Sequence, residues 1–386
     1  MSSPDQLSVI DFESASVVPS THMASDAAFA QPLVAASTDS ELAQTFLYSH
    51  ALSKHSLKST KKDLGRFLLW CQSRSMTLAR LQIEDLNAYK AFLIDPQPVD
   101  QWVSSTKWPR TDQRWRPFSG PLSAVSANHA FRVVKALLEF AKDAGYLTRN
   151  AGALVKNIKT VREARIARYL DVNAIGYVQA TLDAMPANTL AAGKARARDR
   201  FLFLAYVTTG ARLSEITGAC MGAIYAEGDG RWWLDVLGKG DKKRRLPVSL
   251  PLLESFRQYR AQYGLPPQTL RDDTTPLVLA TRGSVIAAVS DEAVSKTLKS
   301  LFARAAEMAE NAGQADCAAA LRNASAHWLR HTMLTTHANN DVSLKVLQDT
   351  AGHANISTTA LYLHKSDRER HDALLGSLAW LAAESR

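Results

Sequence analysis

The stretch TAGHANISTTALYLH, residues 350–364, contains a Gly-His pair, Gly352-His353, and a tyrosine nine residues after the histidine, Tyr362, between two leucines. A tyrosine in an apolar run usually packs in a hydrophobic core. The same residue could instead be a nucleophile, but a phenol then needs neighbouring groups that activate it. The fold and the function therefore depend on which other residues accompany this tyrosine.

A tyrosine that cleaves a phosphodiester needs several partners at once. The pentavalent phosphate gains negative charge, which fixed arginine and histidine donors stabilise. The leaving 5′-oxygen needs a general acid, and the phenol proton needs an acceptor. Because guanidinium groups grip phosphate oxygens in a bidentate manner, arginine is preferred over lysine for the clamp. We therefore expect two arginines, one or two histidines and a lysine near such a tyrosine.

The sequence contains these residue types in separate short motifs. TTGARLSEI, residues 208–216, places an arginine immediately after a Gly-containing break in an apolar helical pattern. RWWLDVLGKGDKKRRLPVSL, residues 231–250, predicts two strands around a Gly-Lys-Gly-Asp turn. HWLRH, residues 327–331, sets a histidine and an arginine three apart, on one helical face. The candidate site residues are Arg212, Lys239, His327, Arg330, His353 and Tyr362.

Each candidate taken alone has a simpler structural explanation. Arg212 and Glu215 could form an ion pair on a helix surface. His327 could be a hydrogen-bonded core histidine, and Lys239 could be a solvated turn residue. The joint occurrence of all six residues, in motifs that suit one reaction, favours a catalytic site over six separate structural roles.

Together these motifs resemble those of the tyrosine recombinases, also called the phage integrase family. TGARLSEI is similar to the family's first arginine box and GKGDKKRRLPV to its catalytic β-hairpin. HWLRHT is similar to the His-x-x-Arg box, and AGHANISTTALYLH to the Gly-His and nucleophile box. The resemblance implies a mainly α fold with a small β-sheet. An N-terminal helical core-binding (SAM-like) domain would precede a C-terminal α+β catalytic domain.

The resemblance also implies a role for each candidate residue. Tyr362 would attack the scissile phosphate, giving a 3′-phosphotyrosyl bond and a free 5′-hydroxyl. Arg212 and Arg330 would hold the non-bridging oxygens. Lys239 would protonate the leaving 5′-oxygen.

The two candidate histidines have separate implied roles. His327 would assist proton transfer with the phenol, and His353 would donate a hydrogen bond to the phosphate. Glu215 is expected to be a buried partner that positions the Arg212 region. No metal or cofactor is expected, because the phosphotyrosine keeps the energy of the broken bond.

Composition and charge indicate a polyanionic partner. Hydrophobic residues make up 46% and charged residues 22% of the 386 residues, an ordinary globular balance, and no apolar run approaches a membrane span. Residues 1–45 hold six acidic residues and no lysine or arginine, so the remainder holds 46 basic against 31 acidic residues, a net charge of +15. A folded body this basic favours a polyanionic partner, most often nucleic acid, and the family resemblance implies double-stranded DNA with a specific recombination site.

Four segments are expected along the chain. Residues 1–38 predict a disordered acidic tail and residues 39–147 a helical core-type DNA-binding domain. Residues 148–168 predict a linker, and residues 169–386 the catalytic domain. A Trp- and Arg-rich interruption at 96–121 could be a DNA contact or a partly packed surface loop.

The favoured function is a site-specific DNA recombinase, an integrase or resolvase of a mobile element. It would act in the cytoplasm, associated with the nucleoid, as a homo-tetramer on DNA with possible accessory DNA-bending or directionality proteins. An Xer-like recombinase for chromosome or plasmid dimer resolution is the alternative. A catalytically silent DNA-binding regulator and a type IB topoisomerase are less favoured.

Overall fold

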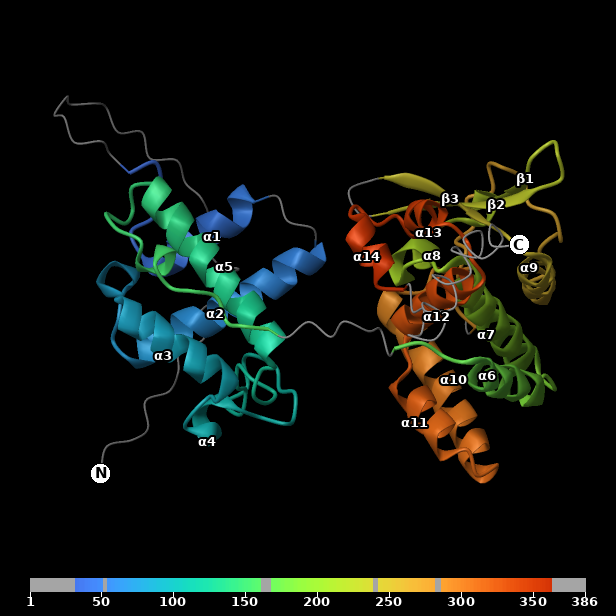
Figure 1. Ribbon diagram of the computed structural model, residues 1–386, viewed down its shortest axis with the longest axis horizontal. Helices are drawn as coiled ribbons and strands as arrows, with labels where there is room; N and C mark the ends of the chain where they lie inside the picture. Colours follow the sequence, from blue (N-terminus) through green and yellow to red (C-terminus); the bar gives the residue numbers. More distant parts are fainter. Residues whose placement is uncertain (1–31, 51–53, 161–167, 239–241, 282–285, 363–386) are drawn as a thin grey trace, which may run out of the picture. The chain divides into compact units, whose positions relative to one another are not determined.

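The computed structural model describes residues 32–50, 54–160, 168–238, 242–281 and 286–362. The chain forms two compact units, Met1–Arg162 and Glu163–Arg386, which are described separately (Figure 1). The candidate Lys239 lies outside the described residues. Within the described residues, none of the helices combines the length and apolar character needed to cross a membrane.

The first unit is all helical in its described part. Its helix α1 begins with a capping box, in which the Thr38 hydroxyl accepts from the Glu41 N–H at 3.2 Å and the Glu41 carboxylate accepts from the Thr38 N–H at 3.2 Å. The apolar faces of the longer helices meet in one core. The helices are α1 (Asp39–Ser49), α2 (Lys54–Ser73), α3 (Ile83–Ile94), α4 (Val99–Trp102) and α5 (Ala124–Asp143), with 3₁₀ turns at Leu78–Arg80 and Ala151–Ala153.

The interruption at 96–121 is partly packed onto this unit. Trp102 and Phe118 are buried in the core. Arg116 donates hydrogen bonds to three backbone carbonyls within the segment. Arg114 stacks 3.3 Å above the Trp108 ring and pairs with a nearby aspartate. Much of its aromatic and basic character therefore holds the loop together.

The second unit is a helical domain with a small sheet at one side (Figure 1). Its helices are α6 (Val172–Ala184), α7 (Leu190–Thr209), α8 (Leu213–Thr217), α9 (Leu250–Gln262), α10 (Asp291–Asn311), α11 (Ala315–Asn323), α12 (Ala326–Asn339), α13 (Leu344–Ala351) and α14 (Ile356–Ala360), with a 3₁₀ turn at Met221–Ala223. Its strands are β1 (Ile224–Ala226), β2 (Trp232–Leu237) and β3 (Lys243–Pro247). The mainly α fold with a small sheet is confirmed.

The sheet is antiparallel with strand order β1-β2-β3. Ile224, Leu234 and Leu246 are cross-strand neighbours and are buried, so this row attaches the sheet to the domain core. The predicted hairpin is present as β2 and β3, whereas β1 was not anticipated. A three-residue strand carries too little periodicity to be recognised in sequence.

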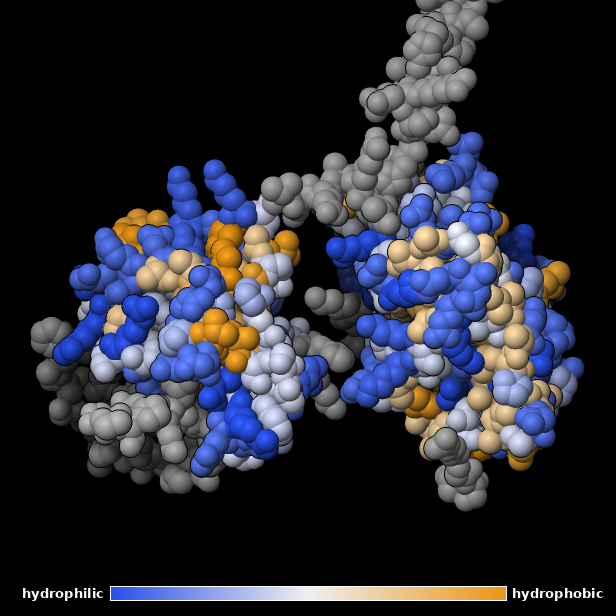
Figure 2. Space-filling model, turned by 90° about the horizontal axis from the view of Figure 1, so that it is seen from below, coloured by the Kyte–Doolittle hydropathy of each residue, from blue (hydrophilic) through white to orange (hydrophobic). Residues whose placement is uncertain are grey.

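Helix α7 ends where the site begins. Gly210 caps it in the left-handed conformation at φ +61°, and a Cβ there would lie 2.1 Å from Met333 Cε. This close approach brings α12 against the end of α7, and α13 packs on both α12 and β3. Hydrophilic residues cover much of the visible surface of both units, with scattered hydrophobic patches (Figure 2).

Candidate active site

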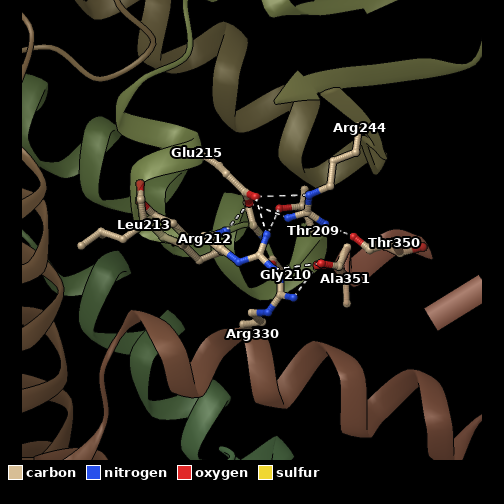
Figure 3. Close-up of polar contacts among 12 residues, drawn as sticks. Thr209, Gly210, Arg212, Leu213, Glu215, Arg244, Arg330, Thr350 and Ala351 are labelled. Carbon is tan, nitrogen blue, oxygen red and sulfur yellow. Dashed lines mark hydrogen bonds and ion pairs between the residues drawn. The ribbon is translucent and has the colours of Figure 1, made fainter. Parts of the chain in front are cut away.

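Three arginines from three different elements converge in the second unit (Figure 3). Arg212 is the N-cap residue of α8, Arg244 lies on β3, and Arg330 lies on α12. Arg212 exposes 36% of its side chain, whereas Arg244 exposes 11% and the whole Arg330 residue 3%. The site thus combines one arginine with a partly exposed side chain and two arginines that are enclosed.

The buried carboxylate of Glu215 holds two of these arginines. Arg212 donates to it through its backbone N–H at 2.6 Å and through Nη1 at 2.8 Å. Arg244 donates through Nη2 at 2.5 Å and through Nε at 3.3 Å. Burial alone would raise the pKa of Glu215, but the hydrogen bonds from Arg244 and Arg212 hold it below its usual value. Glu215 is therefore an ionised anchor for the two guanidiniums.

The C-terminal end of α13 binds all three arginines. The last carbonyls of a helix have no donors within the helix. Here three successive carbonyls accept one guanidinium each: Thr350 from Arg244, Ala351 from Arg330 at 2.5 Å and Gly352 from Arg212 at 3.1 Å. Positive charge is also favourable at this end of the helix dipole.

Gly352 makes this approach possible. It ends α13 with φ +62°, and a Cβ at this position would lie 3.2 Å from Arg244 Cδ. The glycine of the Gly-His pair is thus required by backbone conformation and by its contact with an arginine. It also fixes the point at which the chain leaves α13 toward His353.

The site is strongly electropositive. Burial, together with the nearby charges of Arg212 and Arg244, lowers the pKa of Arg330 to about 10. The Arg330 guanidinium also donates to the Gly210 carbonyl at 2.7 Å, so its position is fixed from two sides. Three guanidiniums with one carboxylate leave excess positive charge, which an anionic group would neutralise.

Tyr362 lies next to this cluster, just after α14. The residue is 2% exposed and packs in a small hydrophobic cluster with Met333, Leu334, Leu347 and other residues of α12 and α13. Its hydroxyl lies 2.5 Å from Nδ1 of His331. Burial raises the pKa of Tyr362 to about 12, although the charge of Arg330 acts in the opposite direction. The residue therefore packs as a core tyrosine while its hydroxyl faces titratable groups.

His331, on α12, was not among the residues selected from the sequence. Its ring lies 4.2 Å from that of His327 and 5.4 Å from that of Tyr362, between centroids. Burial first, and then the charges of His327 and Arg330, lower its pKa to about 4. The signal was present in HWLRH, because residues 327 and 331 are four apart and lie on one helical face.

The other two histidines line the same region. Nδ1 of His353 and the Thr359 hydroxyl share a hydrogen bond of 2.9 Å. The ring centroid of His353 lies 6.3 Å from that of Tyr362. Burial and the charge of Arg330 lower its pKa to about 4. His327 is exposed at the surface, and partial desolvation together with Arg330 lowers its pKa. Both histidines are therefore neutral at pH 7.

The structure brings five of the six candidate residues into one region of the second unit, namely Arg212, His327, Arg330, His353 and Tyr362. Lys239, which follows β2 and precedes β3 in the sequence, lies outside the described residues. Arg244 and His331 also lie in this region and are not among the residues predicted from the sequence. Among the described residues, no group of three or more histidine, cysteine, aspartate or glutamate side chains is placed to hold a metal ion.

A helical domain with a small antiparallel sheet and a tyrosine beside clustered arginines is the arrangement of a strand-transferring recombinase. Residues 178–369 match the phage integrase family. The chain belongs to this family and is a tyrosine-type site-specific recombinase.

Individual relatives agree with this assignment. The chain is 25% identical over 328 residues to tyrosine recombinase XerD of Corynebacterium glutamicum, covering 84% of this chain and 93% of the relative. The fold is similar to that of the XerH site-specific recombinase in a post-cleavage complex with palindromic difH substrate, with a TM-score of 0.59, 17% identity and coverage of 88% and 84%. It is also similar to the Tn1549 transposon integrase in complex with circular intermediate DNA, with a TM-score of 0.56, 16% identity and coverage of 86% and 98%.

Proposed function

We propose that this protein cuts and rejoins double-stranded DNA at a specific site through a 3′-phosphotyrosine formed by Tyr362. The observation that carries the proposal is a cluster of three arginines from separate elements (Figure 3), with Tyr362 near enough to Arg330 for the guanidinium charge to act on the pKa of the phenol. Such a cluster suits a phosphate whose negative charge grows in the transition state.

In this proposal the arginines clamp and the tyrosine attacks. Arg212 and Arg330 hold the non-bridging oxygens, and His353 donates from its Nε2 because Nδ1 is engaged with Thr359. Lys239 protonates the leaving 5′-oxygen. Glu215 does not touch the phosphate but keeps Arg212 in position. Because Tyr362 is 2% exposed, a phosphodiester must displace part of the surrounding chain to reach it.

We further propose that the enzyme works as a homo-tetramer on DNA in the cytoplasm, at the nucleoid. The basic excess of the chain beyond residue 45 supports DNA as the partner. Integration or resolution of a mobile element is the favoured biological role. Residues 1–38 and the 96–121 segment would be additions to a minimal recombinase. Dimer resolution is the second candidate, favoured by the similarity to XerD over most of both chains.

The test of the chemistry is a Tyr362→Phe variant on a suicide DNA substrate that carries the recombination site. Wild-type protein is expected to give a covalent protein–DNA band that resists SDS, and the variant to give none. DNA binding should be nearly unchanged, because the phenol oxygen contributes little to phosphate contacts. A covalent band with the Phe variant would exclude Tyr362 as the nucleophile. The recombination site itself can be sought as inverted repeats flanking a crossover core in the DNA beside the gene.

A further inference from the structure

We infer that His331, and not His327, accepts the phenol proton of Tyr362 during DNA cleavage. The inference rests on the proposed role of Tyr362 as nucleophile and adds a catalytic residue to it. The resemblance to the recombinase family assigns this assistance to the first histidine of HWLRH. The structure instead places the second histidine against the reacting oxygen.

The first step of the argument is geometric. His331 Nδ1 lies 2.5 Å from the Tyr362 hydroxyl oxygen, within the distance at which a general base takes a proton. The described contacts of His327 include the ring of His331 but no hydrogen bond to Tyr362. His327 is also exposed, whereas His331 is 9% exposed and is enclosed with the tyrosine. His331 is thus the histidine in contact with the nucleophile.

The second step concerns protonation. Burial and nearby positive charges keep His331 neutral at pH 7, and one ring nitrogen of a neutral imidazole carries a free lone pair. We assign this lone pair to Nδ1, with the proton on Nε2. The Tyr362 O–H then donates to Nδ1, and no other acceptor for this hydroxyl is present among the described contacts.

The third step is the location of the hydroxyl relative to the clamp. The Tyr362 phenol is near enough to Arg330 for the guanidinium charge to act on its pKa. Arg330 is adjacent in sequence to His331, and both project from α12. A phosphate held by Arg330 would therefore approach the oxygen that His331 already contacts. One helix turn supplies both the clamp and the proton acceptor.

The reaction balances with these groups. The proton of the Tyr362 hydroxyl moves to His331 Nδ1 as the phenol oxygen bonds to phosphorus. The bond between phosphorus and the 5′-oxygen breaks, and the leaving oxygen takes a proton from the general acid proposed at Lys239. In religation the 5′-hydroxyl gives its proton back to the group that supplied it, proposed at Lys239, as its oxygen bonds to phosphorus. The bond between phosphorus and the Tyr362 oxygen breaks, and the imidazolium of His331 returns its proton to that oxygen.

The decisive variant is His331→Asn. The Asn amide oxygen stands near the position of Nδ1, so it can still accept a hydrogen bond but cannot take the proton. Single-turnover formation of the covalent adduct should slow by on the order of 100-fold, with DNA binding retained. A variant rate equal to or above that of wild type would overturn the inference, since the histidine would then only position or restrain Tyr362.

A more acidic phenol supplies the second test. Replacing Tyr362 by a fluorinated tyrosine lowers the need for a base, so the defect of His331→Asn should shrink to less than about 10-fold. The matched control is His327→Gln, whose defect should not shrink. Equal shrinkage for both variants, or none for His331→Asn, would overturn the inference.

A measurement on the unaltered chain guards against misfolding of the variant. The ¹⁵N shifts of the His331 ring, identified by comparison with Tyr362→Phe, should report the tautomer with hydrogen on Nε2. Hydrogen on Nδ1 would overturn the inference. If wild type forms no covalent adduct, the proposed function itself fails. If wild type forms the adduct and His331→Asn forms it equally fast, only the role of His331 fails.

Discussion

Replacing Glu215 by Gln should destabilise the catalytic unit far more than the loss of an ordinary surface ion pair. Four N–H donors, two from Arg212 and two from Arg244, bind the two carboxylate oxygens. Gln keeps the shape but has one oxygen, so some of these donors would face an amide NH₂. It also removes the one carboxylate that pairs with Arg212 and Arg244 among the described ion pairs.

The magnitude follows from burial. Glu215 exposes 1% of its side chain and Arg244 11%, so the pair is enclosed. Removing one partner of a buried ion pair leaves an uncompensated charge and costs about 3–5 kcal/mol in the free energy of unfolding. Because Arg212 and Arg244 also bind the end of α13, adduct formation by Tyr362 should fall as well.

The matched control is Glu227→Gln, the same substitution at an exposed site. Glu227 pairs with Arg245, the neighbour of Arg244 on β3, and their side chains are 39% and 44% exposed. An exposed pair contributes at most about 1 kcal/mol. Urea unfolding of the full chain, followed by fluorescence and circular dichroism at several urea concentrations, measures both changes. A loss for Glu215→Gln no greater than that for Glu227→Gln would refute the anchoring role.

Three further outcomes are expected. Lys239→Ala should cleave an ordinary substrate poorly and a 5′-thio substrate nearly as well as wild type, because a thiolate leaves without protonation; similar rescue of Lys242→Ala would show that the acid is misassigned. DNA affinity should fall steeply with added salt, and removing residues 1–38 should not weaken it, which binding isotherms at several salt concentrations would check. Since folded His331 has its pKa lowered to about 4 from 6.5, the unfolded chain binds more protons between these values. His331 should therefore contribute a loss of on the order of 3 kcal/mol in the free energy of unfolding as pH drops from 7 to 4. In urea titrations His331→Asn should remove this part of the dependence and leave the part due to His353, whose pKa is also lowered to about 4.

Local chemistry in the sequence was enough to predict most helices and the reactive motifs. The motif HWLRH, predicted to place a histidine and an arginine on one helical face, lies in α12 (Ala326–Asn339), because residues three or four apart in a helix share a face. Short elements such as α8 and α14, with five residues each, were not expected. Helices this short depend on tertiary contacts, since isolated turns cost more conformational entropy than their hydrogen bonds return.

The sequence alone also determined the family resemblance, since motif identity and spacing belong to the linear chain. Only the tertiary structure decided which groups meet. In the sequence Arg244 is one of several basic residues of the hairpin motif. In the structure its guanidinium donates hydrogen bonds to the Glu215 carboxylate and to the Thr350 carbonyl. His331 looked like a helical neighbour of Arg330, yet it contacts the Tyr362 hydroxyl. The physical reason is that hydrogen-bond partners far apart in sequence are fixed by the packing of α12, α13 and β3, and residue spacing carries no information about that packing.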